Sequence, residues 1–229
     1  VAYYFSVAAS MMRTTIDTPT HGNQLVNMYA INLAPSGFGK GKSTGLIEDQ
    51  VMDQFDANFR NNTFPILAMQ NLPILANERA ARKGEDPDKM LERVETEFRS
   101  LGAPYFVFDS GSASAVKQVR HQLLMANAGS LNLQVDEIGS KMMGSGEILT
   151  AFLELYDGKI KQKVIKNTSD NFRNEEIPGR TPSNLLLFGT PARLLNGSKT
   201  EEDFYDFLMT GYARRSFFGF HRSIHDAVE

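Results

Sequence analysis

Short hydrophobic runs alternate with longer amphipathic stretches along most of this chain. Apolar runs of strand length predict strands over residues 28–33, 104–108, 130–135 and 184–190, and a final β-rich run that ends at residue 220. Apolar residues at helical spacing predict helices over residues 2–15, 45–59, 113–126, 146–156 and 201–209. Strands that alternate with helices in this way favour an α/β fold with a mainly parallel sheet flanked by helices on both sides.

The same pattern divides the chain into a short N-terminal segment and one large domain. Residues 1–27 are predicted to form a helical segment that packs on the core, and residues 28–229 to form the core itself. Residues 60–101 are highly charged and helical in pattern, which indicates a helical insertion between the first two strands. We interpret the charges of this insertion as a solvated face.

Prolines and aspartates set the expected breaks within that insertion. Pro65 and Pro73 argue against a single straight helix through residues 64–75, because proline lacks an N–H and clashes with the preceding turn. Asp86 or Asp88 is expected to cap the next helix, since a carboxylate can accept hydrogen bonds from the free N–H groups of the first turn.

Composition limits the classes of protein that the chain can represent. Its 229 residues, 41% hydrophobic and 22% charged, suffice for one substantial core. The absence of cysteine rules out disulfides and thiolate metal sites, and a net charge of −3 argues against coating nucleic acid with the whole surface. No run of about eighteen apolar residues predicts a membrane span. The chain starts at Val1, with no initiator methionine and no signal-peptide pattern, so we expect it to be a piece of something longer.

A glycine-rich loop follows the first core strand and is predicted to bind phosphate. Glycines allow successive backbone N–H groups to point at phosphate oxygens, a lysine can reach the terminal phosphates, and a hydroxyl can ligate Mg²⁺. The helix that follows would add the positive end of its dipole. The predicted nucleotide-binding residues are Ala34, Pro35, Ser36, Gly37, Phe38, Gly39, Lys40, Gly41, Lys42, Ser43 and Thr44.

Two alignments of this loop remain open. In the first, Ala34 takes the leading glycine position and Lys40 binds phosphate, so that Ser43, Thr44 or a water must supply the Mg²⁺ ligand. In the second, Lys42 binds phosphate and a serine replaces the leading glycine. We favour the first because the apolar run stops where that alignment begins. A flexible surface loop is the alternative to both.

Two adjacent carboxylates end the strand predicted over residues 130–135. Asp136 is expected to hold Mg²⁺ through water, and Glu137 to orient and deprotonate the water that attacks a γ-phosphate. Combined with the glycine loop, this pair favours hydrolysis over nucleotide binding alone. The polar loop over residues 109–112 is expected at the same edge of the sheet, although Ser112 fits a helix cap equally well.

Three of these segments resemble one family of ATPases. Residues 27–42, 106–112 and 135–139 look like the P-loop domain of the primase–helicase-like ATPases common in bacteriophages and mobile elements. That family resembles hexameric replicative helicases and the superfamily 3 and AAA+ ATPases. Its loop typically reads GPSGxGKG, which supports the first alignment and makes Gly41 a family trait. The departure is Ala34 in place of the leading glycine.

The resemblance also implies a DNA-binding hairpin over residues 158–180. Related hexameric helicases carry the elements that line their central channel at this position, between the carboxylate strand and the next core strand. Lysines that alternate on one face of a strand could grip a nucleic-acid backbone without reading its sequence. A solvated hairpin whose lysines only prevent edge pairing is the alternative. The lysines concerned are Lys159, Lys161, Lys163 and Lys166.

Three further residues take roles by the same resemblance. Thr190 ends a core strand where this class of ATPase commonly carries a polar sensor of the γ-phosphate, although an ordinary strand-end hydroxyl is equally compatible. Arg215, or else Arg214, lies in a segment similar to the arginine-finger segment of AAA+-like ATPases, where a neighbouring subunit completes the site; a surface ion pair is the alternative. His221 and His225 lack the further ligands that a metal site needs.

Together these patterns predict an ATP- and Mg²⁺-dependent motor domain of a phage-type replicative helicase. The implied partners are single-stranded DNA, further copies of the chain in a ring, most simply a hexamer, and other replication proteins. The implied location is the cytoplasm, that of the host cell if the protein is phage-encoded, and a primase domain outside this chain is left open. An ATPase that loads or remodels other proteins is the main alternative. A nucleotide-binding assembly module that hydrolyses little is the third, supported by Gly41.

Overall fold

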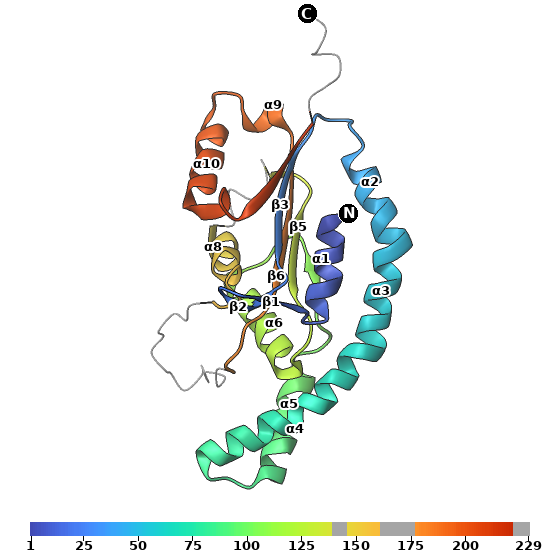
Figure 1. Ribbon diagram of the computed structural model, residues 1–229, viewed down its shortest axis with the longest axis vertical. Coiled ribbons are helices and arrows are strands. Elements are labelled where there is room, and N and C mark those ends of the chain that lie inside the picture. The colour runs from blue at the N-terminus through green and yellow to red at the C-terminus, as the bar shows by residue number, and fades with distance from the viewer. Residues whose placement is uncertain (139–145, 161–176, 222–229) are drawn as a thin grey trace, which may run out of the picture.

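A parallel β-sheet forms the centre of the molecule. The computed structural model describes residues 1–138, 146–160 and 177–221, and within these residues five strands pair in the order β4-β5-β6-β3-β7 (Figure 1). The strands are β3 (Met28–Leu33), β4 (Val107–Phe108), β5 (Leu131–Val135), β6 (Ser183–Gly189) and β7 (Ser216–Phe220). Every pairing in this sheet is parallel. The α/β class and the parallel sheet predicted from the sequence are therefore confirmed.

Helices cover both faces of the sheet, as the nearly continuous apolar strands require. Figure 1 shows α1 (Ala2–Met11), α2 (Lys40–Ile47) and α3 (Asp53–Asn58) on one side and α8 (Gly146–Leu155) and α10 (Lys199–Phe207) on the other. The remaining connections are α6 (Ala113–Ala126), the short α9 (Pro191–Leu194) and the π-helical turn η3 (Leu208–Tyr212). Within the described residues, no helix combines the length and hydrophobicity needed to cross a membrane.

The helix after the glycine loop is much longer than the sequence pattern indicates. It runs from α2 through the π-helical turn η1 (Glu48–Met52), α3, a second π-helical turn η2 (Phe59–Thr63) and α4 (Phe64–Lys83). The predicted break at the prolines is wrong, because Pro73 lies inside α4. Met69, one turn earlier, is exposed, so water can satisfy the carbonyl that Pro73 leaves without a donor. The predicted insertion is thus an extension of this helix.

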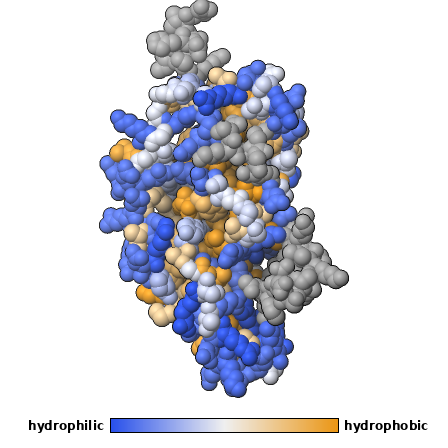
Figure 2. Space-filling model, turned by 180° about the vertical axis from the view of Figure 1, so that it is seen from behind, coloured by the Kyte–Doolittle hydropathy of each residue, from blue (hydrophilic) through white to orange (hydrophobic). Residues whose placement is uncertain are grey.

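Helix α4 and the helix that follows it form a helical hairpin. Gly84 ends α4 in the left-handed conformation, and Asp86 caps α5 (Pro87–Ser100) by accepting hydrogen bonds from the N–H groups of Asp88 and Lys89 at 3.0 and 3.1 Å. Of the two predicted candidates, Asp86 is therefore the cap and Asp88 is not. Figure 2 shows mostly hydrophilic residues at this end of the molecule, in agreement with the solvated face expected of its charges.

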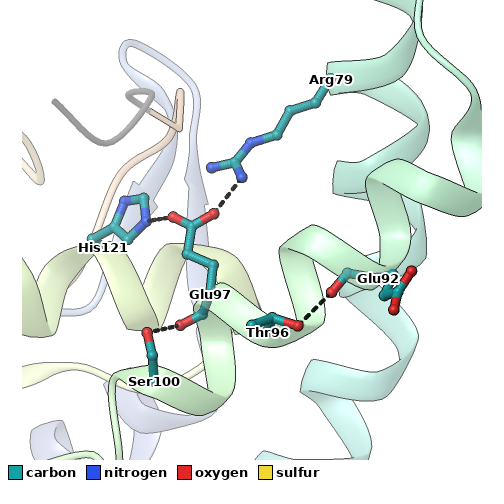
Figure 3. Close-up of polar contacts among 6 residues, drawn as sticks. All are labelled: Arg79, Glu92, Thr96, Glu97, Ser100 and His121. Carbon is teal, nitrogen blue, oxygen red and sulfur yellow. Dashed lines mark hydrogen bonds and ion pairs between the residues drawn. The ribbon is translucent and has the colours of Figure 1, made fainter. Parts of the chain in front are cut away.

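An ion-pair network joins the hairpin to the core (Figure 3). The Glu97 carboxylate on α5 accepts hydrogen bonds from Arg79 Nη1 on α4 and pairs with His121 Nε2 on α6, each at 2.6 Å. Burial by itself would raise the pKa of Glu97, but the hydrogen bonds and charges of His121 and Arg79 outweigh it and lower the pKa from 4.5 to about 2. Ionised Glu97 therefore stabilises the packing of three helices.

Replacing Glu97 with glutamine should cost about 2 kcal/mol of unfolding free energy at pH 7, because Arg79 and His121 both lose the negative charge of Glu97. The folded pKa lies below the unfolded one, so this stabilisation is complete above about pH 4.5 and disappears as the pH falls towards 2. Urea unfolding at pH 7 and pH 3 measures both effects. Glu95→Gln is the control, because Glu95 pairs with Arg99 on the exposed face of the same helix. Equal losses for the two variants at pH 7 would contradict this role of Glu97.

The N-terminal segment is a helix followed by a β-hairpin. Helix α1 forms and packs on the sheet as predicted, but residues 12–27 contain strands β1 (Thr15–Thr18) and β2 (Gly22–Leu25), which the expected helical segment did not include. These strands carry polar residues that are mostly exposed, and so lack the apolar alternation by which a strand is recognised.

Helix α1 is attached to the sheet by buried polar groups as well as by apolar contacts. Asn184 on β6 accepts hydrogen bonds from Ser6 Oγ at 2.7 Å and from the Met28 N–H at 2.9 Å. Its amide donates to Ser10 Oγ at 2.7 Å and to Asn132 Oδ1 on β5 at 2.8 Å. Both asparagines are fully buried. Because all four partners must be in place together, this network fixes the register of α1 against β5 and β6.

Candidate active site

The residues that directly follow four of the strands lie at one edge of the sheet. Ala34 follows β3, Asp136 follows β5, Thr190 follows β6 and His221 follows β7. Neighbouring strands are parallel, so all four positions lie at the carboxyl edge. Ligands of open α/β sheets bind at this edge. The glycine loop and the carboxylate pair, which lie a hundred residues apart in the sequence, therefore share it.

The glycine loop makes a tight turn between β3 and α2. The Ala34 N–H donates to the Gly189 carbonyl at 3.1 Å, which ties the start of the loop to the end of β6. Gly37 and Gly39 both have φ of +80°, a conformation that side chains with a Cβ rarely adopt. Gly39 is also the residue that precedes α2, and the Ser43 N–H donates to its carbonyl at 2.9 Å. The two glycines are thus needed to bring the loop around to the helix.

The two lysines of the loop have different positions. Lys40 is half-buried, and its ammonium group donates to the Ala34 carbonyl at 3.0 Å, to the Gly189 carbonyl at 3.2 Å and to Thr190 Oγ1 at 3.3 Å. It therefore lies inside the turn. Lys42 is exposed on the surface of α2. This arrangement agrees with the alignment in which Lys40 is the phosphate-binding residue.

Thr190 links the lysine to one carboxylate. Its hydroxyl accepts from Lys40 and donates to Glu137 Oε2 at 3.2 Å. The other oxygen, Glu137 Oε1, is buried and has no hydrogen-bond partner within the described part of the chain. A buried carboxylate oxygen without a donor is costly, so it is a natural acceptor for a water molecule or a ligand. Three of the predicted catalytic residues are thus connected, with Thr190 in contact with both Lys40 and Glu137.

The predicted Mg²⁺ ligands lie at the surface of the same edge. Asp136 is exposed at the end of β5, and Ser43 is exposed on the first turn of α2. The Thr44 hydroxyl is occupied by the Lys40 and Gly41 carbonyls at 3.2 and 3.1 Å, whereas no described residue hydrogen-bonds the Ser43 hydroxyl. Hard oxygen donors of this kind suit Mg²⁺, which keeps several waters. Among the described residues, no three acidic or histidine side chains gather into a metal cluster.

A third carboxylate, that of Glu48, connects the two halves of the site. Glu48, on the continuation of α2, accepts hydrogen bonds from Tyr4 Oη at 2.6 Å and from Gln134 Nε2 at 2.7 Å. Burial raises the pKa of Tyr4, and the hydrogen bond to Glu48 raises it further, so the phenol remains a donor at physiological pH. These contacts connect α1, the helix that begins with Lys40 and strand β5, which Asp136 follows.

The two arginines lie at the opposite, amino edge of the sheet, just before β7. Arg215 is engaged within its own chain, because it lies over the Tyr156 ring at 5.4 Å and is 3.6 Å from the Asp157 carboxylate. Its side chain is only 16% exposed. Arg214 is exposed and is the better placed of the two to meet a neighbouring subunit. The role of either arginine in trans stays a prediction.

The predicted DNA-binding lysines fall almost entirely outside the described residues. Lys161, Lys163 and Lys166 lie between residues 161 and 176, together with most of the predicted hairpin. Lys159 is described and is exposed, directly before the buried Ile160. The hairpin therefore stays a prediction.

Sequence reasoning did not assign Asn32 or His221 to the site, and it assigned Phe38 without a contact partner. The His221 N–H donates to the Leu33 carbonyl at 3.0 Å, and its ring lies against Phe38 with 3.6 Å between centroids. Asn32, in the middle of an apolar run, projects from β3 into a cavity beside the loop. A polar residue inside an otherwise apolar strand was the one available signal for Asn32. The contact of His221 with Phe38 depends on the pairing of β7 with β3, which no local pattern reveals.

No protein-family model, curated protein or solved structure matched the chain. Function is therefore inferred from the residues at the carboxyl edge and their geometry.

Proposed function

We propose that the chain is an ATP-hydrolysing domain, the motor of a ring-forming, phage-type replicative helicase. The observation that carries the proposal is the continuous contact from Lys40 through Thr190 to Glu137 beside a glycine loop. A cation, a hydroxyl and a carboxylate in this order supply what transfer of a phosphoryl group to water requires.

Each residue has a distinct role in this proposal. The N–H groups of the loop and the Lys40 ammonium bind the β- and γ-phosphates, and would exchange their present carbonyl partners for phosphate oxygens. Glu137 accepts the proton of the attacking water at Oε1, the oxygen that has no donor among the described residues. Thr190 holds the other oxygen and so orients the carboxylate. Ser43 and Asp136 would hold Mg²⁺, which neutralises charge on the phosphates.

The DNA-dependent part of the proposal rests on the resemblance and on Lys159, Lys161, Lys163 and Lys166. Lysines that contact a nucleic-acid backbone release counterions, so their contribution should fall steeply as salt is raised. The arginine pair before β7 would complete the site of a neighbouring subunit. One observation favours a different function: Gly41 offers no hydroxyl at the usual Mg²⁺ position, which suits a module that binds nucleotide for assembly and hydrolyses little.

Hydrolysis of Mg²⁺·ATP by the assembled protein, with and without single-stranded DNA, tests the proposal. We expect hydrolysis that increases when DNA is added, and an increase that declines with added salt. Hydrolysis at the same rate with and without DNA would instead favour an ATPase that loads or remodels other proteins. Nucleotide binding and assembly without turnover would favour the assembly module.

A further inference from the structure

A cavity of about 530 Å³ lies beside the glycine loop. It is bounded by the first turns of α1 and α2 and by the face of β3, β6 and β7 that these helices cover. Lys40, Ser43 and Thr44 line one end of it, so it is continuous with the predicted phosphate site. Its walls are otherwise largely apolar, as in most small-molecule sites.

A single polar side chain projects from the sheet into this cavity. Among the described strand residues that line the cavity, Asn32 is the only one with a polar side chain. Asn32 is half-buried, and its amide forms no hydrogen bond with any described residue. Gly219 on β7 pairs with Asn32, and a Cβ at that position would overlap Asn32 Oδ1. The glycine therefore keeps open the space in which the amide lies.

Two flat rings lie where the cavity meets the loop. Phe38 belongs to the loop, His221 follows β7, and both line the cavity, with their ring planes inclined at 34°. The backbone hydrogen bond from His221 to Leu33 fixes the position of the histidine. An aromatic surface beside a free amide is suited to a planar heterocycle, which can stack on one and hydrogen-bond to the other.

We infer that this cavity receives the base of the bound nucleotide and that Asn32 selects adenine. The inference rests on the proposed function, because it assigns the base of the same triphosphate. A primary amide offers one acceptor and one donor, which match the amino group and the neighbouring ring nitrogen of adenine. That ring nitrogen is N7; at the same edge guanine presents two acceptors, O6 and N7, and leaves the amide oxygen unpaired. A discrimination of about 10- to 100-fold between the two is expected of one bidentate contact.

Equilibrium binding of ATP, GTP and inorganic tripolyphosphate, each with Mg²⁺, tests the inference. The wild-type protein should bind ATP at least about 10-fold more tightly than GTP, and more tightly than tripolyphosphate. Asn32→Leu should bring ATP and GTP within about threefold of each other while tripolyphosphate binding is unchanged. Gly219→Ala should act in the same direction, because it displaces the amide without removing it. Asn62→Leu, at an exposed position on η2, is the control.

The outcomes separate this inference from the proposed function. If tripolyphosphate binds as tightly as ATP, or if Asn32→Leu keeps the wild-type preference, the base cavity is wrong and the phosphate site stands. If neither ATP nor tripolyphosphate binds the wild-type protein, the proposed function fails and the base assignment fails with it.

Discussion

Replacing Glu137 with glutamine should lower the rate of ATP hydrolysis by about 1,000-fold, because a general base typically contributes 10²- to 10⁴-fold. The amide can still accept the hydrogen bond from the Thr190 hydroxyl, so the geometry of the site and its affinity for ATP should change little. Single-turnover hydrolysis and equilibrium ATP binding, measured on the same sample, separate the two effects.

Glu202→Gln is the matched control for this variant, since Glu202 is exposed on α10 and belongs to none of the contacts of the site. Its hydrolysis rate should equal that of the wild-type protein. A Glu137→Gln protein that hydrolyses ATP at the wild-type rate would remove Glu137 as the base, and would leave Asp136 as the remaining acidic residue of the pair.

Replacing Asn184 with leucine should destabilise the protein by about 4 kcal/mol, a large share of the total stability of a typical domain. Leucine has nearly the same shape, but it leaves the buried Ser6 hydroxyl and the half-buried Met28 N–H without their Asn184 partner and removes the contacts with Ser10 and Asn132. Each unsatisfied buried group costs about 1–3 kcal/mol. The midpoint of urea unfolding measures the loss.

The same substitution at Asn62 gives the comparison, because Asn62 is exposed and bonds only to the neighbouring turn of its own helix. Asn62→Leu should change stability by no more than about 0.5 kcal/mol. A loss below 1 kcal/mol for Asn184→Leu would mean that the polar network does not hold α1 on the sheet.

The elements that the sequence predicts well are those with a strong local pattern. Strand β3 has the predicted bounds, and α6 begins and ends where the apolar spacing indicated, with Ser112 as its cap. The placement of Lys40, Glu137 and Thr190 near one another follows from a general property of parallel sheets, whose strand ends share an edge. The residue types of the loop, combined with this property of parallel sheets, predict which residues lie close to one another at the site.

Features that depend on long-range contacts could not be predicted. Asn132 and Asn184 interrupt apolar strands, and only the pairing of β5 with β6 shows that they satisfy each other. The apolar run over residues 104–108 forms just two residues of strand, because only Val107 and Phe108 pair in register with residues of β5. In the same way, the Asn32 side chain has room only because its neighbour in the sheet, Gly219, has no Cβ.

The central claim is that Lys40, inside the glycine loop, holds the triphosphate. Calorimetric titration of Mg²⁺·ATP into wild-type, Lys40→Ala and Lys42→Ala proteins tests it most directly, because the two lysines lie two residues apart, the Lys40 ammonium contacts the backbone of the loop and Lys42 is exposed. Lys40→Ala should bind ATP about 100-fold more weakly, a loss of about 3 kcal/mol, and Lys42→Ala should bind as the wild type does. Unchanged binding by Lys40→Ala, or a larger loss with Lys42→Ala, would contradict the claim.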